Sequence, residues 1–273
     1  MNSPAPSYIV DLMYDELPLF TRDEVLAKLR DRCGAASAMD PSAGGGLNYF
    51  FPDLRVPFRE GTAPVQVALT VSPSPVPAEL TQADLKQTWD WTEAKDKVAR
   101  HQSHVVVTDL LAAALPYKSR LGFFQNVLGG LLELMMPVAI RWRPSGKIVN
   151  PAALAKALEP GEGRDPLKGA VNVRRTLVKS AGGVVMDTLG LGALGLPDFE
   201  IALGERMPAL FDAMLRSIAR YEYDLGDVIA DGRSFKGGGE SFTCQRRKSS
   251  AEPGRDVFVL IPNKASGQTT VKK

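Results

Sequence analysis

The chain has 273 residues, with 33 lysines and arginines against 31 aspartates and glutamates, so its formal net charge is +2. Hydrophobic residues make up 44% and charged residues 23% of it, which is ordinary for a folded protein and excludes a wholly disordered chain. So balanced a charge offers no broad electrostatic attraction to nucleic acid.

Compartment signals are sparse. The only two cysteines, Cys33 and Cys244, are far apart in the sequence and do not form the framework of a small secreted domain, so we expect unpaired thiols in a reducing compartment. Residues 1–18 lack a basic stretch followed by an apolar run, so no signal peptide is predicted. Residues 121–140 are apolar but interrupted, and a membrane span needs about 20 mostly apolar residues. We expect a cytoplasmic protein with no membrane partner.

Up to residue 110 the sequence predicts short strands and two helices. Thr21 and Glu24 have the spacing of a capping box, so a helix begins here and ends near Gly34. Apolar and polar residues alternate over 65–71, the period of a half-buried strand. In chain order we expect a strand at 8–13, the capped helix, a mobile loop at 35–46, strands at 47–51 and 65–71, a proline-rich connection at 72–77, a helix at 92–101 and a strand at 104–110.

The second half begins with the strongest helix signal of the chain. Apolar residues from Leu121 to Met135 recur at helical spacing until Pro137. Asn150 followed by Pro151 is typical of a helix start. The further predictions are a strand at 138–142, a short helix ending by residue 158, a loop at 160–166, a hairpin of strands 171–178 and 184–189, a strand at 199–203, an amphipathic helix over Met207, Leu210, Phe211, Met214, Leu215 and Ile218, and strands at 242–245 and 257–261.

This mixture favours an α+β fold. Hairpin-like pairs replace strict strand–helix–strand alternation, so we predict a mostly antiparallel, hairpin-rich sheet with amphipathic helices packed on one face. No repeat and no long linker divides the chain. We therefore predict a single domain over residues 1–263, followed by a flexible polar tail at 264–273.

Gly190, Gly192 and Gly195 have the spacing G-x-G-x-x-G. In a dinucleotide site these glycines lie between a strand and a helix, whose N-terminus holds the pyrophosphate. Here the motif is followed by Leu196, Pro197 and another strand-like run. Glycines of a bent or bulged strand are the preferred interpretation.

The sequence contains no recognisable catalytic set. His101 and His104 are the only histidines, and no cluster of cysteine or acidic residues beside them completes a metal shell. Neither cysteine has the context of a nucleophile, and no G-x-S-x-G elbow or phosphate-binding loop is present. We therefore predict no catalytic residue, no metal and no cofactor.

Six residues are candidates for binding. Arg174 with Arg175, and Arg246 with Arg247, are basic pairs that could hold an anion, because guanidinium groups bind phosphate and carboxylate well. Solvated strand ends are the structural alternative. Trp89 and Trp91 flank Asp90 before a predicted helix. They are either anchors of a binding surface or residues packed against that helix.

Several segments, taken in order, resemble a bacterial family known as domain of unknown function 4261. They are residues 88–94 (TWDWTEA), 104–108 (HVVVT), 139–142 (AIRW), 186–190 (MDTLG) with Gly195, 199–201 (FEI), and 219–221 (ARY) with Gly232. The likeness extends over about residues 65–261. The family supplies no catalytic residues to transfer to this chain.

The resemblance implies a function through its setting. Bacterial proteins of this kind are sometimes found with secreted toxins, so we expect a non-enzymatic cytosolic immunity protein that neutralises a toxin by direct binding, with a type VI secretion effector as a natural partner. Inhibitors of basic nucleases are usually acidic, and a pI near 8.5 does not fit that class of target. The alternative is a protein or enzyme that binds a small anion or nucleotide through Arg174, Arg175, Arg246 or Arg247.

Overall fold

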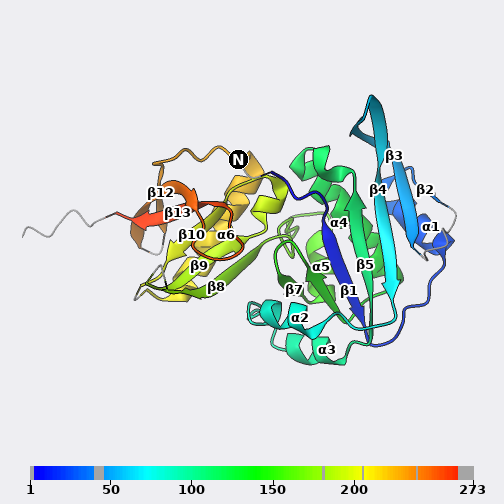
Figure 1. The fold of residues 1–273 in the computed structure, drawn as a ribbon, viewed down its shortest axis with the longest axis horizontal. Coiled ribbons are helices and arrows are strands. Elements are labelled where there is room, and N and C mark those ends of the chain that lie inside the picture. The colour runs from blue at the N-terminus through cyan, green and yellow to red at the C-terminus, as the bar shows by residue number, and fades with distance from the viewer. Residues whose placement is uncertain (1–2, 40–45, 180–181, 205, 238, 264–273) are drawn as a thin grey trace, which may run out of the picture. The chain divides into compact units, whose positions relative to one another are not determined.

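The computed structural model describes residues 3–39, 46–179, 182–204, 206–237 and 239–263. These form two compact units (Figure 1), and each is described by itself. The N-terminal unit consists of residues 3–172 with residues 193–195, and the C-terminal unit of residues 173–192 and 196 onwards. The single domain over residues 1–263 stays a prediction, and the predicted tail at 264–273 lies outside the described residues.

The α+β class is confirmed, with six α-helices and two mostly antiparallel sheets among the described residues, where the sequence indicated one sheet. The N-terminal unit contains a sheet in the order β2-β3-β4-β5-β1-β6-β7, all of whose neighbours are antiparallel. Its strands are β1 (Ile9–Tyr14), β2 (Ser37–Ala38), β3 (Leu47–Phe58), β4 (Gly61–Ser72), β5 (Ser103–Leu110), β6 (Ala139–Trp142) and β7 (Lys147–Val149).

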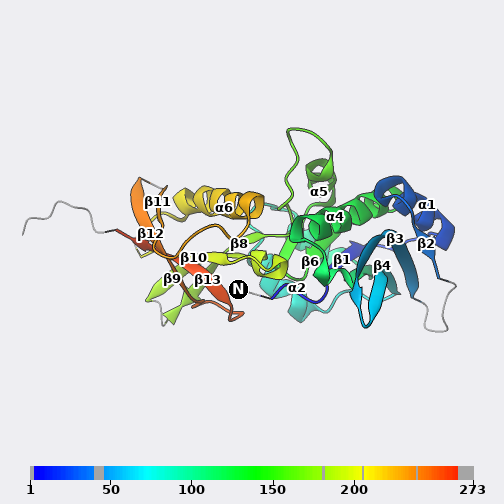
Figure 2. The same ribbon diagram turned by 90° about the horizontal axis from the view of Figure 1, so that it is seen from above.

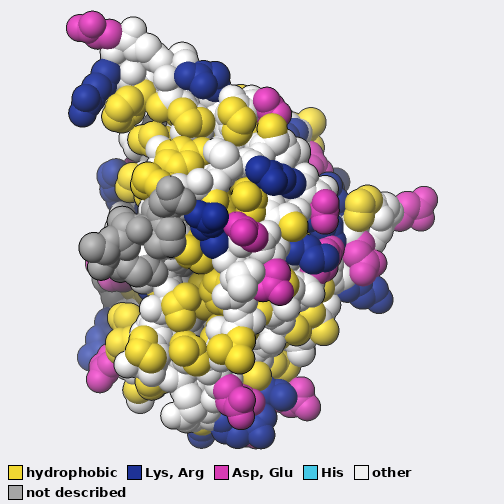
Figure 3. All heavy atoms as spheres, turned by 90° about the vertical axis from the view of Figure 1, so that its right-hand side faces the viewer, with side chains coloured by type: hydrophobic (Ala, Val, Ile, Leu, Met, Phe, Trp, Pro, Cys, Tyr) yellow, Lys and Arg dark blue, Asp and Glu magenta, His cyan; other side chains and the backbone are white. Residues whose placement is uncertain are grey.

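Helices cover both faces of this sheet, whereas the sequence indicated one face. Helices α1 (Arg22–Cys33), α4 (Tyr117–Leu134) and α5 (Pro151–Leu158) lie on one side (Figure 2), and α2 (Ala78–Leu85) lies on the other. The next helix in the chain is α3 (Ala94–Arg100). Its Val98 belongs to a small hydrophobic core with Met13 of β1, Val76, Ala139 and Ile148. The face drawn in Figure 3 exposes charged side chains of both signs among apolar ones.

The predicted starts of helices α1 and α5 are confirmed, and at each of them a side chain caps the helix. Thr21 accepts a hydrogen bond from the amide of Glu24, and the Glu24 carboxylate accepts one from the amide of Thr21. Asn150 accepts from the amide of Ala153 at the start of α5. These bonds satisfy amides that a helix N-terminus otherwise leaves without partners.

The C-terminal unit is a second sheet in the order β11-β12-β13-β10-β9-β8, with one parallel pair, β10 and β13. Its strands are β8 (Asn172–Val178), β9 (Gly183–Leu189), β10 (Asp198–Ala202), β11 (Ser234–Gly237), β12 (Glu240–Lys248) and β13 (Asp256–Pro262). Helix α6 (Pro208–Leu225) buries Phe211, Leu215 and Ile218 of the predicted stripe. The Phe211 ring meets Phe242 of β12 edge-on, with ring centroids 5.9 Å apart.

Some elements differ from the predictions. Helix α2 and strands β2, β7 and β11 were not predicted, and β2 falls inside the segment 35–46 that was expected to be a mobile loop. Residues 40–45 of that segment lie outside the described residues. Strand β3 runs on past residue 51 to Phe58 through an irregularity between Phe51 and Arg55. The glycine motif does not lie in a bent strand, because residues Leu191–Leu194 form a 3₁₀ helix between β9 and β10.

No described helix is both long enough and apolar enough to span a membrane.

Candidate functional site

The predicted arginines of β8 point to opposite faces of the second sheet. Arg174 is largely buried and donates two hydrogen bonds to the fully buried carboxylate of Asp187, from Nε at 3.1 Å and Nη2 at 2.5 Å. Arg175, the next residue, is exposed. Because successive side chains of a strand alternate between faces, one of the pair is used inside the unit and the other faces outward.

Asp187 belongs to a buried network that sequence analysis missed. Arg255 donates to Asp187 through Nη2 at 2.6 Å and to Asp198 through Nε at 3.1 Å. Both carboxylates are fully buried, and burial raises the pKa of Asp198 against the opposing charge of Arg255. With Arg174 the network contains two acids and two bases, so its charges balance. Paired and hydrogen-bonded in this way, buried charges are tolerated.

The same network explains the glycine motif. Asp198 accepts hydrogen bonds from the amides of Leu191 and Gly192, both at 3.2 Å, and from the hydroxyl of Thr188 at 2.9 Å. Backbone amides of this kind would bind phosphate in a nucleotide site. Here the carboxylate of Asp198 accepts the hydrogen bonds of these amides, which agrees with the prediction that the glycine motif is not a dinucleotide site.

Arg246 and Arg247 lie on β12, at the other side of this sheet. Arg246 forms an ion pair with Asp227, its amide donates to Asp231 at 2.7 Å, and its guanidinium lies 4.5 Å from the centre of the Phe258 ring. Arg247 is exposed and donates to the side-chain oxygen of Gln245.

The four arginines do not converge on one anion site. Strands β13, β10 and β9 separate β12 from β8, a distance of roughly 19 Å at the usual spacing of neighbouring strands. A small anion therefore cannot touch both basic pairs, and Arg174 and Arg246 already have internal carboxylate partners.

Beside Arg246 lies an acid with an unusual environment. Glu222 of α6 is fully buried, and its carboxylate oxygens accept no hydrogen bond within the described ranges. Burial raises the pKa of Glu222 to about 7, helped by the negative charge of Asp227 and opposed by Arg246. Sequence analysis did not single out Glu222, because nothing in the pattern shows that α6 turns this side chain inward.

The C-terminal unit carries exposed apolar side chains. Four of them form what we call the apolar surface: Leu177 of β8, Val184 of β9, and Met207 and Leu210 at the start of α6, which are 72%, 37%, 68% and 53% exposed. The amide of Leu203, just after β10, donates to the carbonyl of Val184. The segment that connects β10 to α6 therefore begins beside Val184. Arg175 shares the face of β8 that carries Leu177, two residues away.

The exposure of Met207 and Leu210 corrects the prediction that the whole apolar stripe of this helix is buried. Met207 and Leu210 have the helical spacing of core residues, together with Phe211, Leu215 and Ile218, but they remain exposed while the other three are buried. Isolated apolar residues on a surface are ordinary, whereas a group of them points to an interaction.

Trp89 and Trp91 are half-buried in the N-terminal unit. Trp91 packs against the core formed around Met13, Val98 and Ile148. Of the two predicted roles, anchor of a binding surface or packed residue, the structure shows packing for Trp91. It also faces a cleft of about 240 Å³ that is lined by Asp90, Trp91, Ile148, Val149, Asn150, Ala153 and Lys168. Trp91 therefore forms part of the wall of a small cavity, whereas Trp89 is not among the residues that line it.

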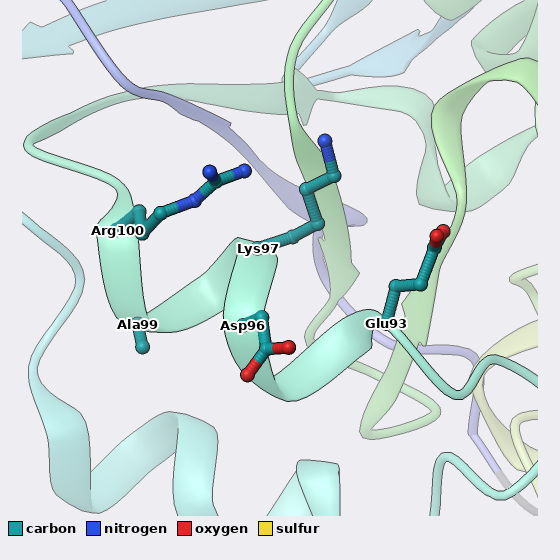
Figure 4. A pocket seen from close by; sticks show the side chains of 5 residues that line it. All are labelled: Glu93, Asp96, Lys97, Ala99 and Arg100. Carbon is teal, nitrogen blue, oxygen red and sulfur yellow. The ribbon is translucent and has the colours of Figure 1, made fainter.

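A second hollow lies on α3. Its five lining residues, Glu93, Asp96, Lys97, Ala99 and Arg100, all come from this one helix and the residue before it. Figure 4 shows Asp96 pointing away from Lys97 and Glu93. The hollow is an open depression with two acids and two bases, and no second element among the described residues lines it.

The histidines have structural partners. Nε2 of His101 accepts from the amide of Val76 at 2.8 Å, and Nδ1 of His104 lies 2.7 Å from the carbonyl of Ser74. Among described residues there is no group of three or more histidine, cysteine or acidic side chains that could hold a metal. Cys33 and Cys244 are free thiols, and burial raises the pKa of each to about 12.

Comparison with known families relates part of this chain to a family. A family model described as Domain of unknown function (DUF4261) matches residues 187–261. The resemblance is thereby confirmed over these residues, which include Asp187, Asp198, Glu222, Arg246 and Arg255, and it stays a prediction for residues 65–186. Neither the curated proteins nor the solved structures contain a match to this chain.

Proposed function

We propose that this protein acts by binding another protein, without making or breaking a covalent bond, and that the apolar surface of the C-terminal unit is where the partner docks. The observation that carries the proposal is the exposure of Leu177, Val184, Met207 and Leu210 at one end of the sheet. Covering such side chains removes apolar area from water and stabilises a complex by about 25 cal/mol per Å² before the costs of association.

The internal chemistry supports the same proposal. Arg174, Arg255, Asp187 and Asp198 are bonded to one another in a buried network, and the glycine turn is filled by Asp198. Groups used in this way stabilise the unit and are not presented to a substrate. What the unit presents outward is an apolar surface beside Arg175, the composition of an interface centre with a polar rim.

The specific form of the proposal is an immunity protein of bacterial origin that neutralises a toxin, for example a type VI secretion effector, in the cytoplasm. The pI near 8.5 favours a target that is not a basic nuclease, because like charges oppose association. Toxin neutralisation needs a tight, long-lived complex, which a rigid sheet and helix provide better than a mobile loop.

Co-expression with the product of the neighbouring gene, followed by size-exclusion chromatography and a toxicity assay, tests the proposal. We expect the two proteins to co-elute and the cells to be protected. Leu177→Asp and Met207→Asp, each of which places a charge on the apolar surface, should abolish both effects. Leu19→Asp, at a residue of the N-terminal unit that is 94% exposed, is the matched control and should change neither.

Circular dichroism and urea unfolding of each variant show whether it is folded. The proposal is overturned if the wild-type pair never co-elutes and gives no protection, or if the two variants bind as well as the control.

A further inference from the structure

The cleft at Trp91 in the N-terminal unit combines apolar walls with a cation. The half-buried Trp91 ring and the exposed Ala153 of α5 supply the apolar part, and Lys168 supplies the cation. Ile148 and Val149 of β7 also line the cleft but are only 0% and 1% exposed. At about 240 Å³ the cavity is small, because typical ligand sites measure roughly 300–1,000 Å³ and a cavity of about 150 Å³ already holds benzene. The cleft therefore fits one aromatic or branched group and little more.

The two charged residues that line the cleft differ in their partners. Asp90 accepts a hydrogen bond from Lys147 at 2.5 Å, and this ion pair is half-buried. Burial alone would raise the pKa of Asp90, but the bond and charge of Lys147, together with the charge of Lys168, lower it. Asp90 is thus ionised at neutral pH and already neutralised by Lys147. It is a poor partner for a cationic ligand.

Lys168 has no ion-pair or hydrogen-bond partner for its ammonium group in the ranges that the structure covers, although the charge of Asp90 is near enough to interact with it. Counted together, Asp90, Lys147 and Lys168 leave one positive charge at the cleft. Asn150 adds a donor, since its side-chain oxygen is used by the amide of Ala153 and its NH₂ group is the part left to offer.

We propose that this cleft binds a small apolar carboxylate, with the carboxylate at Lys168 and the apolar group against Trp91 and Ala153. A charge-assisted bond between ammonium and carboxylate is among the stronger polar contacts, and burial of the apolar group adds to it. The same chemistry occurs in a free organic acid and at the C-terminal residue of a peptide. The site lies in a different unit from the apolar surface and does not depend on the proposed function.

Isothermal titration calorimetry of the full chain with three probes tests this. The probes are phenylacetate, N-acetyl-phenylalanine and N-acetyl-phenylalaninamide, of which the third lacks the carboxylate but keeps the ring. We expect an acid to bind with a dissociation constant of about 1 mM or lower, and the amide at least about tenfold more weakly, since one such charge contact is worth about 1.4 kcal/mol or more. If phenylacetate binds as well as N-acetyl-phenylalanine, the source is a free acid. If only the latter binds, it is a chain terminus.

Two pairs of variants locate the binding. Lys168→Met keeps the length of the side chain and removes its charge, and should weaken acid binding at least about tenfold, whereas Lys95→Met, at an exposed residue of α3, should not. Ala153→Phe fills the cleft and should abolish binding, whereas Ala152→Phe, the exposed neighbour that does not line it, should leave binding intact. Equal binding of acid and amide, no binding of either acid, or an unchanged affinity in Lys168→Met overturns the proposal.

Discussion

Glu222 is a carboxyl group that folding moves out of water without giving it a hydrogen-bond donor. Its pKa rises from 4.5 to about 7, so between these pH values the folded chain keeps a proton that the unfolded chain has lost. The free energy of unfolding therefore falls as the pH rises through this range and levels off above it. In Glu222→Gln this contribution is absent, so we expect the stability of the variant at pH 8 relative to pH 5 to exceed that of the wild type.

Urea unfolding of both proteins at pH 5 and pH 8 measures the difference. Asp224→Asn is the control, because Asp224 is an exposed acid of the same helix, paired with Arg220 four residues earlier, and should follow the wild type. Parallel pH profiles of wild type and Glu222→Gln would contradict the argument.

The sequence indicated which arginines and tryptophans are candidates for binding, but it did not indicate which residues they contact. Arg174 and Arg246 were chosen because basic pairs bind anions, yet Asp187 and Asp227 bind them within the unit. Those carboxylates are 13 and 19 positions away, and only the pairing of strands or the path of the chain after α6 brings them near. Trp91 lies at a cleft for a similar reason, since Lys168 comes from a distant loop.

At the scale of elements, helices α1 and α4 pack closely through a glycine. A side chain at Gly130 would place its Cβ 3.2 Å from the carbonyl oxygen of Lys28 in α1, whereas at Gly122 of the same helix it would meet nothing within 4 Å. Gly130→Ala should therefore destabilise the protein by about 1 kcal/mol or more, because backbone must shift. Gly122→Ala should stabilise it by about 0.5–1 kcal/mol, because alanine favours a helix interior.

Thermal or urea unfolding of the two alanine variants checks this directly, since both make the same chemical change in one helix. If Gly130→Ala were as stable as Gly122→Ala, glycine would not be needed where the two helices meet.

Elements with a strong local signal could be predicted. The capping box of α1, the Asn150–Pro151 start of α5 and the apolar stripe of α4 are local features, and the structure confirms each. Helix α2 buries only Thr81, and β11 buries no residue at all. An element without a buried face leaves no hydrophobic period in the sequence, and β7 is only three residues long.

At the scale of the whole molecule, the described strands form two separate sheets, one in each unit. The strand hydrogen bonds of each unit are therefore formed within that unit, and a substitution that destabilises one unit should increase unfolding in that unit alone. Arg255→Met leaves Asp187 and Asp198 with one guanidinium fewer in a buried site, a loss of about 3–5 kcal/mol. We expect faster amide hydrogen exchange in β9, β10 and β13, and unchanged exchange in β1 and β5.

Hydrogen exchange followed by mass spectrometry resolves these strands. Arg247→Met, which removes an exposed arginine from the same sheet, should leave exchange in both units near the wild-type rate. Equal acceleration in β1 and β10 of the Arg255 variant would show that the two units unfold together.

The position of β13 has a consequence for synthesis of the protein. This strand lies between β12 and β10, in the middle of its sheet, although it follows all its partners in the chain. While the ribosome is still translating residues before 256, β10 and β12 each present an unpaired edge of the kind on which nascent chains aggregate. The C-terminal unit cannot complete its sheet during elongation until that last strand has left the exit tunnel and inserted between the other two.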